Sequence, residues 1–253
     1  MIEVANISKR FFDHQVISNI SVLFERGKTN LIIGQSGSGK TVLMKCLVGL
    51  LQIDEGEIFY DERPLTKMGF TERKQLRQEI GMLFQGSALF DSMTVEENVM
   101  FPLSMFTEMP IEAQRERANF CLKRVNLTNS NKLFPSELSG GMKKRVAIAR
   151  AISPQPKYLF CDEPNSGLDP KNSIVIDNLI REITQEYQIT TVINTHDMNS
   201  VIEIGDKIAF IYNGKLWWEG DHDDILITEN KEINDFIYST KLMQKIKHLT
   251  TKS

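Results

Sequence analysis

The sequence predicts an α/β fold built on a mostly parallel sheet, and three observations predict it. First, short continuous apolar runs alternate with helical patterns, as expected for parallel strands that helices cover on both faces. Second, residues 1–26 alternate polar and apolar side chains, which predicts an N-terminal antiparallel β subdomain with a turn near Asp13. Third, a mostly helical stretch of about 87–150 separates two buried strands and predicts an inserted α-helical subdomain. The buried strands are expected at residues 29–33, 80–84, 157–162 and 190–194.

Two hairpins complete the expected strands. Residues 208–212 and 216–219 pair across Asn213-Gly214, a dipeptide that favours the tight turn of a hairpin. A smaller hairpin is expected at 53–62, with residues 54–56 at its turn because they contain a glycine beside two acids.

The composition is that of a globular protein with one sizeable core, because 41% of its 253 residues are hydrophobic and 25% are charged. We expect one domain, 1–253, with the helical subdomain at about 87–150 and a polar, basic tail at about 232–253. The formal net charge of −3 gives no reason to expect nucleic acid as a partner. No apolar stretch of about 18 residues occurs, so no membrane span is expected, and the first residues lack a signal-peptide pattern.

The three cysteines are scattered along the chain and show no metal-ligand spacing. Their odd number suits a reducing cytosol. A metal held by a cluster of cysteine and histidine is therefore not expected.

A glycine-rich loop at residues 34–41 fits the phosphate-binding pattern G-x-x-x-x-G-K-[ST], with a buried strand before it and a helical pattern after it. Glycines let the backbone wrap around a phosphate, and the helix N-terminus adds favourable partial charge. Lys40 is expected to reach the β- and γ-phosphates, and Thr41 to offer its hydroxyl to Mg²⁺. The alternative is a glycine-rich turn with a solvated lysine. The nucleotide contacts predicted here are Gly34, Gln35, Ser36, Gly37, Ser38, Gly39, Lys40, Thr41 and Val42.

At residues 158–163 an apolar strand is followed by two acids, Asp162 and Glu163. Asp162 is expected to face the Mg²⁺ shell, as the second acid of a phosphate-loop site does. Glu163 points differently and is our choice for the general base that polarises the attacking water. A surface loop at a strand end is the alternative for both acids. Cys161 is interpreted as core packing.

A second glycine-containing loop, residues 138–142, reads Leu-Ser-Gly-Gly-Met and precedes a helical, basic run. Small residues before a helix N-terminus make a second anion site. Two phosphate-binding loops about a hundred residues apart need not serve one nucleotide within one chain.

With these motifs in this order, the chain resembles an ABC-transporter nucleotide-binding domain over essentially its whole length. Residues 34–41 resemble the family's Walker A, residues 158–163 its Walker B with the catalytic glutamate, and residues 138–142 its signature motif. The remaining resemblances are residues 166–169 to the D-loop, Gln85 to the Q-loop glutamine, His196 to the switch histidine and Phe11 to the aromatic that stacks on adenine.

The resemblance implies a P-loop NTPase (RecA-like) core that hydrolyses ATP with Mg²⁺ as a head-to-tail homodimer. Each ATP would lie on one chain's residues 34–41 and be capped by Ser139, Gly140 and Gly141 of the other copy. It also implies that Gln85 touches Mg²⁺ and that His196 holds the γ-phosphate and the attacking water. A separate membrane permease would place the chain at the cytoplasmic side of the bacterial inner membrane. Simple packing is the alternative for Phe11.

Two features narrow the resemblance within the family. Met142 ends the signature where glutamine is commoner, and residues 84–95 also stand out. Together they resemble the ATPase subunits of Mla/Mce lipid-transport systems, which implies phospholipid or another lipid as cargo and an Mce-domain protein as a further partner. The chain departs from that pattern at Gly86-Ser87, whose order is reversed, and at Asn165.

Two other functions stay open, and a third is disfavoured. One is a non-transport ABC ATPase that acts as an assembly or scaffold factor, and another is an ABC transporter ATPase for a different substrate. A small-molecule kinase does not explain residues 138–142. An apolar group after Gln85 is expected to be half core and half a groove for a short helix of the membrane subunit. Its members are Leu89, Phe90, Met93, Val99, Met100 and Phe101.

Overall fold

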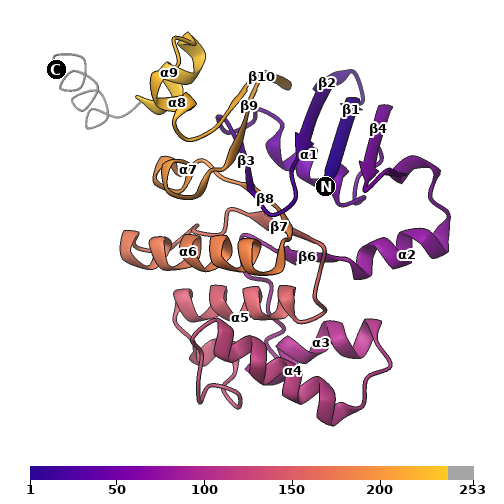
Figure 1. The fold of residues 1–253 in the computed structure, drawn as a ribbon, viewed down its shortest axis with the longest axis vertical. Helices are drawn as coiled ribbons and strands as arrows, with labels where there is room; N and C mark the ends of the chain where they lie inside the picture. Colours follow the sequence, from indigo (N-terminus) through magenta and orange to yellow (C-terminus); the bar gives the residue numbers. More distant parts are fainter. Residues whose placement is uncertain (239–253) are drawn as a thin grey trace.

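The computed structural model describes residues 1–238. Figure 1 shows three layers, of which a central sheet is the middle one. This sheet has six strands in the order β10-β9-β3-β8-β7-β6. All neighbours are parallel except β9 and β10, which form the expected hairpin. The strands are β3 (Thr29–Ile33), β6 (Ile80–Leu83), β7 (Tyr158–Asp162), β8 (Thr190–Asn194), β9 (Lys207–Tyr212) and β10 (Lys215–Gly220).

Successive residues of the central strands point to opposite faces of the sheet and enter two different cores. Leu159 and Cys161 of β7 belong to the core on the helical side, whereas Tyr158 and Phe160 belong to the core on the other side. All four are at most 1% exposed. Burial on both faces explains why these strands read as continuous apolar runs.

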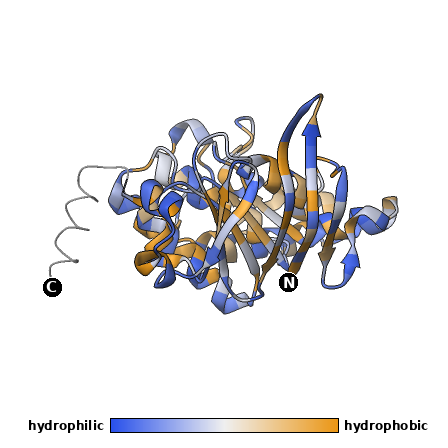
Figure 2. Cartoon of the chain, turned by 90° about the horizontal axis from the view of Figure 1, so that it is seen from above, coloured by the Kyte–Doolittle hydropathy of each residue, from blue (hydrophilic) through white to orange (hydrophobic). Residues whose placement is uncertain are grey.

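On one face lies the N-terminal antiparallel sheet, in the order β2-β1-β4-β5, together with α1 (Lys40–Leu47) and α2 (Phe70–Gln78). Hydrophobic and hydrophilic residues alternate along its strands (Figure 2), because one side of the sheet packs on the core. The elements of this sheet are β1 (Ile2–Phe11), β2 (His14–Phe24), β4 (Glu55–Tyr60) and β5 (Arg63–Pro64), followed by the 3₁₀ turn η1 (Leu65–Lys67).

The turn expected at residues 54–56 is wrong. Glu55 already begins β4, and β4 turns back into β5 at Asp61 and Glu62, which both have positive φ angles. Gly56 has a φ of 84°, and a Cβ there would lie 2.4 Å from the carbonyl oxygens of Ala5 and Asn6. Glycine is needed at this position because β4 passes close to β1, and it makes no turn.

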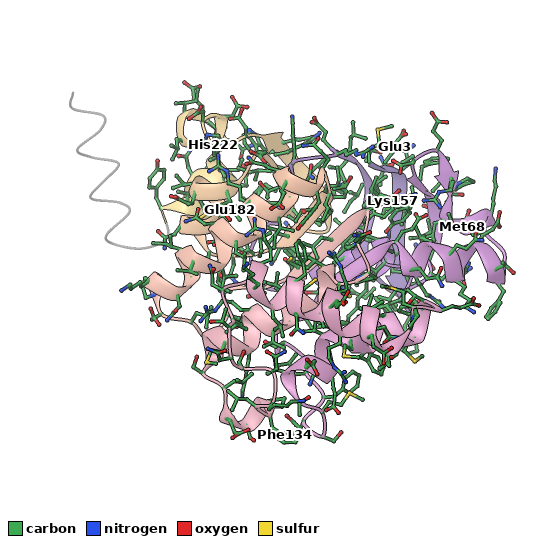
Figure 3. The ribbon with its side chains drawn as sticks, turned by 60° about the horizontal axis from the view of Figure 1, so that its bottom comes forward. Glu3, Met68, Phe134, Lys157, Glu182 and His222 are labelled. Carbon is green, nitrogen blue, oxygen red and sulfur yellow. The ribbon has the colours of Figure 1, made fainter. Side chains whose placement is uncertain are left out.

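The helical subdomain on the other face consists of α3 (Val95–Phe106), α4 (Ile111–Arg124), η2 (Pro135–Glu137) and α5 (Gly140–Ile152). Thr94 and Glu97 form a capping box that starts α3. Phe134, labelled at the far end of this subdomain in Figure 3, is 42% exposed. Within the apolar group after Gln85, Val99 and Met100 are core residues, whereas Phe90 is 39% exposed and packs on Phe101.

The remaining helices are α6 (Pro170–Tyr187), α7 (Met198–Ile204), α8 (Asp224–Ile227) and α9 (Lys231–Ile237). The boundary expected for a polar tail at about 232 is too early, because Ile233 and Ile237 of α9 are buried and Phe236 packs on Phe210. The rest of the predicted tail, from residue 239 on, lies outside the described residues. None of the helices in residues 1–238 is both long enough and apolar enough to cross a membrane.

Candidate nucleotide site

The glycine loop, the two acids and His196 gather at the carboxyl ends of β3, β7 and β8, which are adjacent parallel strands. Such an edge is where ligands bind in open α/β sheets, because the loops leaving the strands surround a crevice there. The glycine loop follows β3, the two acids close β7 and its turn, and His196 follows β8. Thr195 donates its backbone N–H to the carbonyl of Ile32 at 3.1 Å, which ties the loop after β8 to β3.

The glycine loop has a backbone that only glycine tolerates at its two ends. Gly34 has a φ of 148°, and a Cβ there would lie 2.2 Å from the carbonyl oxygen of Ile211. Gly39 has a φ of 105° and caps α1, and its Cβ would lie 2.8 Å from Ile17. These close approaches keep the loop compact against its neighbours, with the N-terminus of α1 next to it.

Lys40 bridges the loop from inside. Its ammonium donates to the carbonyl of Gly34 at 2.8 Å and to that of Gln35 at 3.0 Å. The residue is only 8% exposed. Burial lowers the pKa of Lys40, and the nearby carboxylates of Glu163 and Asp162 oppose this shift.

Ser38 was expected to contact the nucleotide, and the structure adds neighbours that the sequence did not indicate. Its carbonyl accepts from the backbone N–H of Gly214 at 3.1 Å, so the β9–β10 turn supports the loop. Its Oγ is buried and has no hydrogen-bond partner among residues 1–238. A buried hydroxyl that lacks a partner is what a phosphate oxygen could satisfy.

The two acids differ in their surroundings. Asp162 accepts a hydrogen bond from the Asn194 amide at 2.6 Å, across paired positions of β7 and β8. Glu163 has a φ of 49°, and its carboxylate Oε1 lies 2.7 Å from Nδ1 of His196. The structure therefore brings Glu163 and His196 into direct contact. Asn194 was missed, although a polar residue that ends a strand beside an acidic one could have indicated it.

The other predicted residues come from the loop after β6, from α1 and from β1. Gln85 donates its side-chain amide to Ser166 Oγ at 3.3 Å, which joins the loop after β6 to the expected D-loop. Thr41 is exposed at the start of α1, and Val42 is half-buried beside it. Phe11 ends β1, is 38% exposed and has the ammonium of Lys9 at 5.6 Å from its ring centre. None of the hydrogen bonds described within residues 1–238 joins the Gln85 side chain to Thr41 or Asp162.

The loop of residues 138–142 begins α5, with Ser139 Oγ accepting from the N–H of Met142 at 3.3 Å. Its glycines face residues after β7: a Cβ on Gly140 would lie 3.6 Å from Leu168, and one on Gly141 3.4 Å from Asn172. The described hydrogen bonds join no residue of this loop to residues 34–42. The structure thus does not bring Ser139, Gly140 and Gly141 onto the chain's own glycine loop.

The donor set fits a nucleoside triphosphate with Mg²⁺. Hydroxyl and carboxylate oxygens, as on Thr41 and Asp162, are the ligands that Mg²⁺ takes beside phosphate oxygens. The buried, unpartnered Ser38 Oγ and Asn194 Oδ1 leave hydrogen-bonding capacity at the same edge. Residues 1–238 hold no group of three or more histidine, cysteine or acidic side chains that could bind a metal ion without the nucleotide.

A glycine loop between a parallel strand and a helix, with an acid at the end of a neighbouring strand, defines a nucleotide-binding protein of the P-loop class. The family model described as ABC transporter matches residues 17–166, which is more than half of the chain. The chain belongs to the ABC transporter family, and it is an ATP-binding, ATP-hydrolysing subunit. The predicted α/β fold is confirmed by the solved structures that it resembles.

Similar curated proteins carry two different names. The methionine import ATP-binding protein MetN of Clostridium tetani is 38% identical over 243 residues, which are 96% of this chain and 76% of MetN. The intermembrane phospholipid transport system ATP-binding protein MlaF of Haemophilus influenzae is 34% identical over 237 residues, 94% of this chain and 90% of MlaF.

Among solved structures, the dimeric bacterial ABC transporter cassette MJ0796 matches with a TM-score of 0.80 and 31% identity, covering 88% of this chain and 99% of that one. The same cassette in a post-hydrolysis state with ADP and Pi gives a TM-score of 0.79 and 30% identity over the same shares. The cbiO1 protein of Clostridium perfringens, part of the cbiONQ transporter complex, gives 0.84 and 29%, with 99% and 98% covered.

Proposed function

We propose that two copies of this chain clasp two ATP molecules head to tail and drive lipid transport through a separate membrane permease. The observation that carries the dimer is the position of the loop at residues 138–142: Gly140 lies near Leu168 and Gly141 near Asn172, and none of the hydrogen bonds in residues 1–238 joins this loop to residues 34–42. A second copy can present this loop to the nucleotide of the first. The dimeric state of the similar cassette MJ0796 supports this arrangement.

Within one site, each chain holds the triphosphate on residues 34–42, with Lys40 turning from the loop carbonyls toward the phosphates. Bound Mg²⁺ would neutralise phosphate charge, and Thr41, Asp162 and Gln85 are the residues to hold it. Glu163 accepts the proton of the attacking water, and His196, 2.7 Å away, holds Glu163 and the water in line with the γ-phosphate. Phe11 stacks on the adenine ring.

Phospholipid or a related lipid is the proposed cargo, with an Mce-domain protein as a further partner. Support comes from Met142, from residues 84–95 and from the similarity to MlaF along 90% of its length. The chain would act at the cytoplasmic side of the bacterial inner membrane. Methionine is the second candidate cargo, because several MetN importers are similar, one of them at 38% identity.

The test of cargo is reconstitution with the permease that co-purifies with the chain. In vesicles of this complex, ATPase activity should rise with added phospholipid and stay unchanged with L-methionine and its binding protein. The reverse result makes the methionine reading correct. Co-purification of soluble proteins alone would support the scaffold alternative instead.

The test of the catalytic roles is Glu163→Gln, which keeps the shape of the side chain and removes the base. Turnover should fall by about 10²–10⁴-fold, the usual contribution of a general base. ATP binding should persist, and an ATP-dependent dimer should accumulate in light scattering. Hydrolysis at the parental rate would show that another group is the base.

A further inference from the structure

A buried cation of the signature helix binds the backbone at two predicted catalytic positions. Lys144 lies in α5, which starts at the Ser139 loop, and is only 4% exposed. Its ammonium donates to the carbonyl oxygen of Gln85, and to that of Glu163 at 3.3 Å. One side chain therefore joins α5, the loop after β6 and the turn after β7.

The surroundings explain how an ammonium can be buried here. Burial lowers the pKa of Lys144, and the side chains of Cys161, Glu163 and Asp162 oppose this shift. The two carbonyls supply the hydrogen bonds that a buried ammonium requires. Removing the Lys144 ammonium leaves the carbonyl oxygens of Gln85 and Glu163 without this hydrogen-bond donor. The effect of such a substitution should therefore fall mainly on these two residues.

Both segments that Lys144 holds have backbone conformations that need support. Glu163 has a φ of 49°, and Ser87 and Ala88, just after Gln85, have φ angles of 63° and 47°. For residues other than glycine, such angles are strained and persist only where neighbours hold them.

A second cation of the same helix shares part of this task. Arg150 donates to the carbonyl of Ser87 at 2.8 Å and to that of Ala88 at 2.7 Å. None of the hydrogen bonds and ion pairs in residues 1–238 joins Arg150 to Glu163. Lys144 is therefore the cation of α5 that connects the loop after β6 with the turn carrying the proposed base.

We propose that Lys144 is a positioning residue for ATP hydrolysis, which fixes the backbones of Gln85 and Glu163 to the helix that begins with the signature loop. This role of Lys144 rests on the proposed function, in which Glu163 is the base. A Glu163 carboxylate displaced by a fraction of an ångström loses its alignment with the water and the γ-phosphate. Nucleotide binding depends on residues 34–42 and is not directly touched.

The test is a series at position 144, with steady-state ATPase kinetics. Lys144→Met should lower kcat by about tenfold or more, as misalignment of a base does, while the KM for ATP changes by less than about threefold. Lys144→Arg keeps two or more donors and should recover most of kcat. Arg150→Met, which frees Ser87 and Ala88 alone, should lower kcat less than Lys144→Met. Lys123→Met, on the exposed side of α4, should match the parental protein.

Coupling to Glu163 separates positioning from general loosening. In the Glu163→Gln background, Lys144→Met should lower the residual turnover no further, because the base is already absent. Circular dichroism and thermal melting check the fold. Should Lys144→Met fail to fold, Lys144→Gln, with an amide for one carbonyl, should show the reduced kcat at unchanged KM.

Two results overturn the proposal: parental kcat in a folded Lys144→Met or Lys144→Gln protein, or additive losses with Glu163→Gln. Failure of the proposed function looks different. In that case Glu163→Gln forms no ATP-dependent dimer, whatever position 144 holds. A Glu163→Gln protein that dimerises with ATP, beside a Lys144→Met protein with parental kcat, rejects the positioning role alone.

Discussion

Lys40 makes hydrogen bonds within the glycine loop that a bound phosphate can replace. Its hydrogen bonds to the carbonyls of Gly34 and Gln35 satisfy the ammonium while it is 8% exposed. Phosphate oxygens carry more charge than these carbonyls, so charge-assisted hydrogen bonds to a nucleotide are stronger. The carboxylates of Asp162 and Glu163 favour the charged form of Lys40 against its burial.

We predict that Lys40→Ala weakens ATP binding by about 10–100-fold, the effect of losing hydrogen bonds of about 1.5–3 kcal/mol to a charged group. Hydrolysis should fall at least as much. Titration calorimetry with Mg²⁺ and ATP measures the affinity. Lys45→Ala, an exposed lysine of the same helix, is the matched control and should bind like the parental chain. Equal affinities of the two variants would remove Lys40 from the site.

Residue identity allowed the glycine loop and the two acids to be predicted, because their chemistry depends on side chains adjacent in sequence. Lys144 could not be predicted in the same way. It belongs to a basic run, Met142 to Arg145, that reads as a solvated helix face, and only the packing of α5 on two distant turns buries it. Gly56 wrongly suggested a turn for a related reason. Glycine is required there by the nearby backbone of β1, which the local sequence does not indicate.

At the scale of elements, the strands that are buried on both faces were the best predicted, because continuous apolar runs with glycine or acid at their ends have few other interpretations. Helix α9 was interpreted as part of a polar tail. Its seven residues contain only a few apolar side chains. Phe236 packs on Phe210 of the central sheet, and Ile233 and Ile237 are buried in the same core, so the burial of this helix depends on residues far away in the sequence. A pattern this short carries too little periodicity to indicate a helix.

Three elements around the site are joined by a buried carboxyl. Asp177 of α6, 2% exposed, accepts from Asn165 after β7 at 2.8 Å and from Ser200 of α7 at 2.8 Å. Burial raises the pKa of Asp177 to about 6, although the hydrogen bonds from Ser200 and Asn165 oppose the shift. The network thus connects the turn before the expected D-loop with the helix that follows His196.

The sign of the pH effect follows from the raised pKa. Between pH 4 and pH 6 the folded state binds more protons at Asp177 than the unfolded state, so the free energy of unfolding falls as pH rises through this window. Above pH 6 the loss is complete. Asp177→Asn removes this loss while keeping hydrogen-bonding groups.

We predict that Asp177→Asn gains stability relative to the parental protein as pH rises. Its free energy of unfolding minus that of the parental protein should be about 2 kcal/mol higher at pH 7.5 than at pH 4.5. Urea unfolding at both pH values measures it. Asp235→Asn, an exposed carboxyl on α9, serves as the control and should show no such change. A pH-independent difference for Asp177→Asn would mean that this carboxyl ionises alike in both states.

For the whole molecule, the central sheet separates two kinds of function. The N-terminal sheet, α1 and the glycine loop form the side that we propose holds the chain's own nucleotide, whereas α3, α4 and α5 lie on the opposite face (Figure 1). The start of α5 packs near Leu168 and Asn172 at the surface, beside the exposed residues Gly167 and Asp169. A second chain approaching this surface meets the Ser139 loop and the expected D-loop together.

A bulky cation at Ser139 should therefore separate binding from assembly. Ser139→Arg leaves residues 34–42 of its own chain untouched, so its affinity for ATP should stay within about twofold of parental. ATPase activity should fall by about tenfold or more, because closure over the partner's nucleotide is blocked. In the Glu163→Gln background the ATP-dependent dimer should disappear from light scattering. Thr128→Arg, an exposed position of the same subdomain, should leave dimer and activity intact. Full activity of Ser139→Arg would place this loop outside the nucleotide site.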